Sequence, residues 1–192
     1  MNTDKFLNTP TLYTDRLILR KFEITDAEDV FDYGKQPAVS KYMSWDKHKS
    51  INDAINYIEF TINRYENGDA GEWAIILKET GKLIGAIGFV RFEEGNFCGE
   101  IGYALSKDYW SQGLMTETLK RIIRFSFEDI RINRVVAIHA IENPASGKVM
   151  QKANMQFEGI LKQRYYAKEK FWDTKQYAIV KSDWLNIDDD LK

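Results

Sequence analysis

The stretch that most constrains the fold is a strand pattern that feeds a helix pattern through a short polar turn. Ile101, Tyr103 and Leu105 alternate with smaller or polar residues, as a half-buried strand does. An apolar stripe at helical spacing follows, made of Met115, Leu119, Ile122, Ile123 and Phe127. The Val/Ile-rich segment 134–141 comes next. Strand, helix and strand in this order predict a right-handed crossover between two parallel strands.

The turn within this stretch contains Ser111, Gln112 and Gly113, which are small or polar. The first N–H groups of a helix have no intrahelical partner and carry partial positive charge, so several of them converging here predict a phosphate cradle. The alternative is an ordinary strand-to-helix turn in which Gly113 supplies only flexibility.

Upstream, residues Leu12–Phe22 alternate as a first strand. Thr25 and Glu28 form a Thr-x-x-Glu pattern that predicts a capping box and a short helix ending near Gly34 and Pro37.

A second helix is predicted from Ser50, with Asp53 three residues later, and Asn67-Gly68 ends it. Between the two helices lies an aromatic loop that contains Tyr42 and Trp45. Such a loop could wall a substrate pocket, and the alternative is satellite packing on the core.

Three antiparallel strands are predicted next, Glu72–Lys78, Leu83–Phe92 and Phe97–Leu105. The turns Thr80-Gly81 and Glu94-Gly95-Asn96 separate them.

After the parallel pair, Asn143 followed by Pro144 predicts a helix start with Asn143 as the N-cap, and Asn154 a left-handed end. Met155–Tyr166 and Phe171–Trp184 then predict an aromatic hairpin, before a solvated acidic tail at 188–190.

Composition narrows the class of protein. The 192 residues suit a single domain (1–192, core about 10–185), and the formal net charge of −2 argues against a dedicated nucleic-acid or membrane-surface protein. The sequence shows no signal peptide or membrane-spanning run, which predicts a cytoplasmic location. One cysteine, Cys98, and two histidines, His48 and His139, indicate neither a disulfide framework nor a metal site. Cys98 is interpreted as a strand residue rather than a nucleophile, because no activating partner is evident.

At this point the chain resembles the GNAT superfamily of N-acetyltransferases, and within it the RimJ/RimL-like branch of ribosomal-protein N-terminal acetyltransferases. The resemblance covers nearly the whole chain through motifs that are individually weak but fall in the family's order. These are residues 14–20, Gly85-Ala86-Ile87-Gly88, residues 99–103, residues 109–117, residues 143–146, residues 152–155, Trp172-Asp173, Tyr177 and Trp184.

The resemblance implies an α+β (mixed α/β) GNAT fold. Its central sheet would be mixed but mostly antiparallel, with about seven strands and about four flanking helices, and its parallel fourth and fifth strands would splay apart. Acetyl-CoA would then be the co-substrate, with its pantetheine arm between those strands and no metal required. In the family's pyrophosphate loop pattern only Gly113 matches, while Trp110, which is usual in this branch, and Met115 depart from the general form.

The resemblance also implies a set of cofactor-binding residues. They are Tyr103, Ala104, Leu105, Ser111, Gln112, Gly113, Leu114, Met115, Thr116, Asn143, Ser146 and Lys148. The expected substrate pocket comprises Tyr42, Trp45 and Tyr165.

For the chemistry, the family implies direct attack of an amine on the thioester in a ternary complex. Glu100 is the candidate general base, directly or through water, and its alternative role is an ion pair with a cation on a neighbouring strand. Many relatives protonate the leaving thiolate with a Tyr where this chain has Met150, so the acid would come from elsewhere or from water. The resemblance implies Ser146 as the candidate, because it matches a serine that the RimL-like branch places near the sulfur; alternatively its hydroxyl supports the helix start. Tyr165 stands where the RimL-like branch places a carboxylate.

The expected function is acetyl transfer to a primary amine, either a protein N-terminus, as in ribosomal-protein alanine acetyltransferases, or a small molecule. The alternative is a catalytically silent GNAT-fold module that binds acyl-CoA as a sensor or partner. A homodimer is compatible with the resemblance, since dimers are common among relatives.

Overall fold

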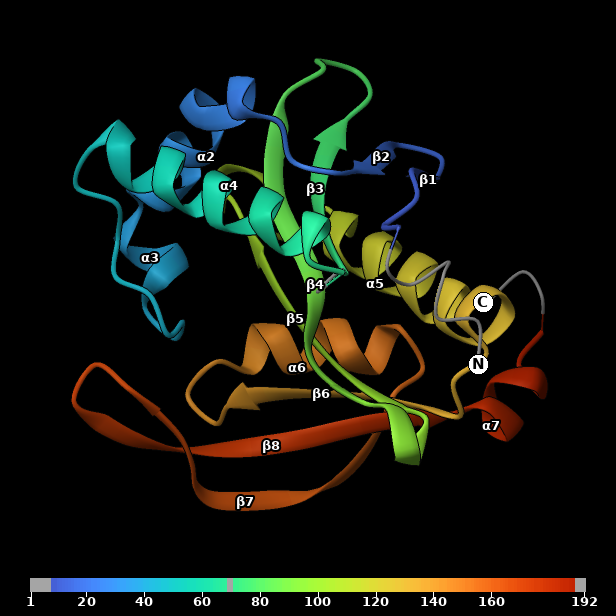
Figure 1. The fold of residues 1–192 in the computed structure, drawn as a ribbon. Helices are drawn as coiled ribbons and strands as arrows, with labels where there is room; N and C mark the ends of the chain where they lie inside the picture. Colours follow the sequence, from blue (N-terminus) through green and yellow to red (C-terminus); the bar gives the residue numbers. More distant parts are fainter. Residues whose placement is uncertain (1–7, 69–70, 189–192) are drawn as a thin grey trace. The chain divides into compact units, whose positions relative to one another are not determined.

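Two strands, β4 (Leu83–Glu93) and β5 (Cys98–Leu105), run through both of the units into which the chain divides. The structure is a computed structural model that describes residues 8–68 and 71–188 (Figure 1). We call residues 8–68, 71–88 and 103–114 the N-terminal unit, and residues 89–102 and 115–188 the C-terminal unit. Asp189 and Asp190 of the predicted acidic tail lie outside the described residues.

The described residues form eight strands, hydrogen-bonded in the order β1-β2-β3-β4-β5-β6-β8-β7. The other six are β1 (Leu12–Tyr13), β2 (Leu17–Arg20), β3 (Glu72–Leu77), β6 (Arg134–Ala140), β7 (Gln156–Ala167) and β8 (Lys170–Val180). Antiparallel ladders join β1 to β2, β2 to β3, β3 to β4, β6 to β8 and β7 to β8. The predicted mixed, mostly antiparallel α+β architecture is therefore confirmed.

The strand count exceeds the expected seven because the predicted strand Leu12–Phe22 is broken. A turn separates β1 from β2, where the Thr14 N–H donates to the Leu17 carbonyl at 3.1 Å and the Leu17 N–H donates to the Thr14 hydroxyl at 3.0 Å. The two halves then pair with each other as an antiparallel hairpin.

The N-terminal unit carries helices α2 (Ala27–Gly34), α3 (Pro37–Ser40) and α4 (Ile51–Glu66). Helix α4 begins with the predicted capping box between Ser50 and Asp53, and it ends at the predicted Asn67. Side chains from these helices and from the strands form one buried cluster that includes Val30, Tyr33, Ala54, Ile58, Ala74 and Leu83. The core is what fixes the helices to this part of the sheet.

The predicted capping box of Thr25 and Glu28 is wrong. The box joins Glu23 and Asp26 instead, around a 3-10 turn, Ile24–Asp26, that precedes α2. Arg20 explains the shift, because its guanidinium holds the buried Asp26 carboxylate through two hydrogen bonds of 2.7 Å. Asp26 also accepts the Glu23 N–H at 2.8 Å.

The C-terminal unit contains most of α5 (Leu114–Phe125), which continues through a π-helical turn, Ser126–Ile130. The predicted apolar stripe of this helix is buried throughout: Met115, Leu119, Ile122, Ile123 and Phe127. In Figure 1, α6 (Pro144–Lys152) lies along β6, and β7 and β8 form a long hairpin. Asn154 ends α6 with φ 63°, as predicted.

The second arm of that hairpin is shorter than the predicted Phe171–Trp184. It ends at Val180, and Trp184 lies on a short helix, α7 (Lys181–Leu185), where its ring packs 5.5 Å from the ring of Phe127. Two short helices, α3 and α7, raise the number of described α-helices to six from the expected four. Trp184 is therefore a buried residue of a helix, and not of a strand as predicted.

The parallel pair predicted from the strand, helix and strand order is confirmed. Residues Cys98–Glu100 of β5 pair with Arg134–Val136 of β6. This ladder ends before the two strands do, because β5 continues to Leu105 and β6 to Ala140. The early end of the ladder agrees with the predicted splay of two parallel strands.

Replacing Asp26 with Ala should lower the free energy of unfolding by about 2 to 4 kcal/mol, since the half-buried Arg20 guanidinium would lose its charged partner and the Glu23 N–H its acceptor. Chemical denaturation measures this change. The matched variant Glu28→Ala removes an exposed carboxylate from the box that does not form, and its effect should stay within about 0.5 kcal/mol. Equal losses in the two variants would contradict the observed cap.

Candidate active site

Glu100, the candidate base, lies in the parallel ladder of the C-terminal unit opposite Val136. Its side chain is only 18% exposed, and its Oε2 lies 4.0 Å from Nη2 of Arg164 on β7. This ion pair is long and the guanidinium is 44% exposed, so it is a weak interaction. The observed cation is on β7, which is not a sheet neighbour of β5, and the role of Glu100 as a general base stays a prediction.

The start of α6 holds Asn143, Ser146 and Lys148 in the same unit. Asn143 occupies the N-cap position before Pro144, as predicted, but its side chain makes no capping hydrogen bond. Its backbone N–H donates to the Ala140 carbonyl at 2.8 Å. The side-chain amide is therefore not used as the helix cap that the sequence predicted. Ser146 is half-buried and Lys148 is exposed.

A close approach between α6 and β6 sets the position of this helix. A Cβ on Gly147 would lie 2.5 Å from Nε2 of His139, so only glycine fits there without displacing the ring. His139 is buried on β6 and stacks on Tyr177. Met150, in the place of the family's acid, is 1% exposed and belongs to the core. Its thioether has no proton to donate.

Cys98 is half-buried at the start of β5. Burial raises the pKa of its thiol, which favours the unreactive protonated form. This agrees with its interpretation as a strand residue.

In the N-terminal unit, the segment from Tyr103 to Leu114 leads from β5 into α5. Ser111 and Gly113 both adopt left-handed backbone conformations, with φ of 61° and 79°. Together with Gln112 they are exposed, immediately before a helix of 12 residues. The predicted polar turn is therefore present, directly before the N-terminus of a helix. A serine in this conformation is strained, because its Cβ lies too close to the following carbonyl oxygen.

Hydrogen bonds within this segment hold its shape. The Trp110 indole N–H donates to the Leu105 carbonyl at 2.8 Å, and the Gln112 side chain donates to the Asp108 carbonyl at 3.1 Å. The Leu105 carbonyl, one of the groups expected to face pantetheine, thus already has one partner within the chain.

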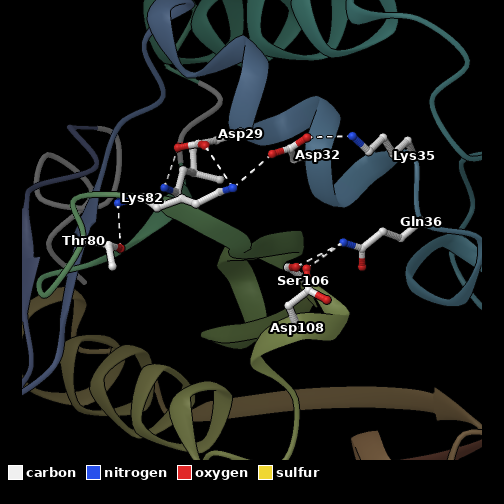
Figure 2. Close-up of polar contacts among 9 residues, drawn as sticks. Asp29, Asp32, Lys35, Gln36, Thr80, Lys82, Ser106 and Asp108 are labelled. Carbon is white, nitrogen blue, oxygen red and sulfur yellow. Dashed lines mark hydrogen bonds and ion pairs between the residues drawn. The ribbon is translucent and has the colours of Figure 1, made fainter.

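Two side chains from distant parts of the sequence also bind this segment. The Gln36 amide donates to the Ser106 hydroxyl and the Asp108 carboxylate (Figure 2). The Gln36 side-chain carbonyl accepts the Lys107 N–H at 2.9 Å. Arg16 donates through Nη1 to the Gln112 carbonyl at 3.0 Å. Neither role was assigned from the sequence, because no local pattern links residues 70 to 96 positions apart.

A polar pocket of about 180 Å³ lies next to Gln36 in the N-terminal unit. Its charged groups pair with one another: Lys82 lies 3.0 Å from Asp32 and 3.8 Å from Asp29, and Lys35 lies 2.7 Å from Asp32 (Figure 2). Hydrogen bonds from the two lysines lower the pKa of Asp32. The lysines and aspartates of this pocket therefore compensate one another's charge.

The three residues expected to line the substrate pocket have different environments. Trp45 is half-buried and packs against the core cluster of the N-terminal unit, while the Tyr42 ring lies 5.0 Å from the Lys41 ammonium. The packing of Trp45 matches the alternative interpretation of this loop. Tyr165 belongs to the C-terminal unit, on β7 opposite Trp172.

Comparison with known proteins identifies the family. The profile described as "Acetyltransferase (GNAT) domain" matches residues 16–156. The chain is 33% identical to the Bacillus licheniformis protein named "Uncharacterized N-acetyltransferase p20", over 91% of this chain and 98% of that protein. The chain therefore belongs to the GNAT family of N-acetyltransferases.

Two further similarities concern the branch and the fold. The "Ribosomal-protein-serine acetyltransferase" of Escherichia coli is 29% identical over 68% of this chain and 72% of that protein. The crystal structure of "Microcin C7 self immunity acetyltransferase MccE in complex with Acetyl-CoA and AMP" superposes with a TM-score of 0.78 at 23% identity, covering 87% of this chain and 93% of that one. The first agrees with the RimJ/RimL-like resemblance of the sequence, and the second shows the GNAT fold.

Among the described residues, no helix combines the length and apolar character needed to cross a bilayer. The same residues contain no cluster of three or more His, Cys, Asp or Glu side chains that could hold a metal ion.

Both histidines should make the fold acid-sensitive. Burial lowers the pKa of His139 and His48 in the folded chain. Nδ1 of His139 donates to the Ala140 carbonyl at 2.7 Å, whereas Nε2 has no hydrogen-bond partner among the described residues. Protonation would therefore bury an unpaired N–H. The unfolded chain, with ordinary pKa values near 6.5, takes up these protons first, so stability is lost as the pH falls below about 6.5.

Denaturation at pH 7.5, 6.5 and 5.5 measures this effect, which has an upper limit of about 1.4 kcal/mol per pH unit for each histidine. His139→Gln should reduce the slope, and the double variant with His48→Gln should reduce it further. Curves that stay parallel to the wild type would contradict the lowered pKa values.

Proposed function

We propose that the chain transfers an acetyl group from acetyl-CoA to a primary amine by direct attack within a ternary complex. The observation that carries this proposal is the exposed turn before α5, where two left-handed residues flank Gln112 at the N-terminus of a 12-residue helix. Helix N-termini favour phosphate groups through their unpaired N–H groups and the helix dipole. The solved complex of the similar protein MccE with acetyl-CoA supports the same donor here.

The proposed cofactor residues are those that the family resemblance implies. Ser111, Gln112, Gly113 and Leu114 with Met115 and Thr116 would bind the pyrophosphate through backbone N–H groups. The backbone of residues 103–105, together with Asn143, Ser146 and Lys148, would bind the rest of the molecule. The Asn143 side chain supports this, since it makes no capping hydrogen bond at the start of α6.

In the proposed reaction acetyl-CoA supplies a thioester with an electrophilic acyl carbon. Glu100, directly or through water, accepts the proton that the attacking amine loses as the C–N bond forms. Ser146 donates a proton to the sulfur as the C–S bond breaks. Its position in the first turn of α6 and the absence of a donor on Met150 support this assignment.

Replacing Glu100 with Gln should lower kcat by about 10² to 10⁴, the usual contribution of a general base, with little change in acetyl-CoA affinity. Steady-state kinetics and calorimetry measure the two quantities. Arg164→Gln is the matched control, because it removes the ion pair and keeps the carboxylate. A carboxylate that only pairs with Arg164 would give the same small effect in both variants.

Replacing Gly113 with Val should weaken acetyl-CoA binding at least about tenfold. A β-branched residue is strained at a φ of 79°, so the turn would lose the backbone conformation that the proposed pyrophosphate site needs. Gly81→Val is the control, since Gly81 also has a left-handed φ of 69° but faces open space in the β3–β4 turn. Calorimetry that finds unchanged affinity for the Gly113 variant would remove the turn from the cofactor site.

The acceptor would be a protein N-terminus or a small amine, and Tyr42, Trp45 and Tyr165 are the residues that the sequence proposes for its binding. The relative named as a ribosomal-protein-serine acetyltransferase supports the first choice. Thiol release from acetyl-CoA across N-terminal peptides and small amines, with mass spectrometry of the product, tests both. Binding without turnover on any acceptor would favour the silent acyl-CoA-binding module. The homodimer and the cytoplasmic location stay predictions.

A further inference from the structure

Arg16 reaches the predicted pyrophosphate loop from a part of the chain 96 residues away. It lies in the turn between β1 and β2, and its backbone carbonyl accepts the Lys78 N–H at 3.0 Å. The Thr14 and Leu17 bonds that close this turn fix the backbone on either side. The guanidinium therefore extends from a well-held anchor to the Gln112 carbonyl.

The direction of one peptide group follows from this contact. The bond between Gln112 and Gly113 is trans, because the described chain has no cis peptide bonds. In a trans peptide the carbonyl and the following N–H point in opposite directions. Since the Gln112 carbonyl points toward Arg16, the Gly113 N–H points away from Arg16, out of the other side of the loop.

The same contact strengthens that N–H as a donor. A hydrogen bond from a cation to a carbonyl is charge-assisted, and it polarises the peptide group that it binds. The neighbouring left-handed residues, Ser111 and Gly113, hold the peptide from both ends. The second guanidinium nitrogen lies 3.6 Å from the position that a Cβ on Gly113 would occupy. Both terminal nitrogens of Arg16 therefore lie close to the loop.

We propose that Arg16 is a positioning residue for the donor substrate: it orients the Gln112–Gly113 peptide so that the Gly113 N–H binds the pyrophosphate of acetyl-CoA. This inference rests on the proposed function. The role explains why a cation is bound to a carbonyl on the loop that is expected to bind an anion.

Arg16→Met should weaken acetyl-CoA binding about tenfold. It should leave kcat/KM for S-acetylpantetheine unchanged, because that donor carries the thioester and the pantetheine arm but no pyrophosphate. Calorimetry and thiol release measure the two quantities. Arg16→Lys, which keeps a cationic donor, should recover part of the affinity. Equal losses with both donors, or no loss with acetyl-CoA, would overturn the inference.

Two further measurements separate positioning from direct contact between Arg16 and a phosphate. In the free protein, the Gly113 amide resonance should shift in the Arg16→Met variant before any donor is added, and an unchanged resonance would count against positioning. The affinity loss should also persist at 0.5 M salt, whereas a direct ion contact would be screened. A loss that disappears at high salt would therefore contradict the proposal.

The controls distinguish failure of this inference from failure of the proposed function. Arg91→Met removes another exposed arginine, which pairs with Glu93 at 3.0 Å in the C-terminal unit, and it should leave acetyl-CoA affinity unchanged. If the wild type binds acetyl-CoA and Gly113→Val weakens it while Arg16→Met does not, only the role of Arg16 is wrong. If the wild type does not bind acetyl-CoA, the proposed function itself fails.

Discussion

Close backbone packing around β5 is the constraint on which both groups of candidate residues depend. At its start, the parallel ladder with β6 places Glu100 opposite Val136. At its end, the Leu105 carbonyl accepts the Trp110 indole N–H, and the segment that leads to Gly113 begins there. Glycine makes this packing possible, because a Cβ on Gly85 would lie 2.3 Å from the Ala104 carbonyl oxygen. The strand β5 therefore carries Glu100 and also leads into the loop that contains Gly113.

The loop before α5 cannot determine its own shape. Its left-handed residues are costly for a serine, and its carbonyls need donors that the loop alone does not supply in full. Arg16 of the first hairpin donates to the Gln112 carbonyl, and Trp110 of the loop itself donates to the Leu105 carbonyl. At the α2–α3 junction, the Gln36 side-chain carbonyl accepts the Lys107 N–H. Such a loop is organised before any ligand arrives, which lowers the entropy cost of binding a flexible donor.

The start of α6 shows how packing and chemistry share residues. Gly147 lets the helix approach His139, and the buried Met150 fills core space where many relatives carry an acid. The thioether of Met150 has no proton to donate, so the proposed reaction relies on Ser146 for the acid and on positioning and electrostatics for the rest. The family membership fixes the class of reaction, whereas the acceptor depends on side chains such as Tyr42 and Tyr165.

The sequence by itself determined the elements whose signals are local: the Ser50 cap, the apolar stripe of α5, the left-handed Asn154 and the order of strands that makes β5 and β6 parallel. Only the tertiary structure decided that Arg20 moves the α2 cap to Glu23, that Trp184 is helical, and that Arg16 binds Gln112. The physical reason is the distance along the sequence between the groups that interact. Capping and periodicity act within a few residues, whereas a buried ion pair or a bond across 96 residues exists only once the sheet has brought its partners together.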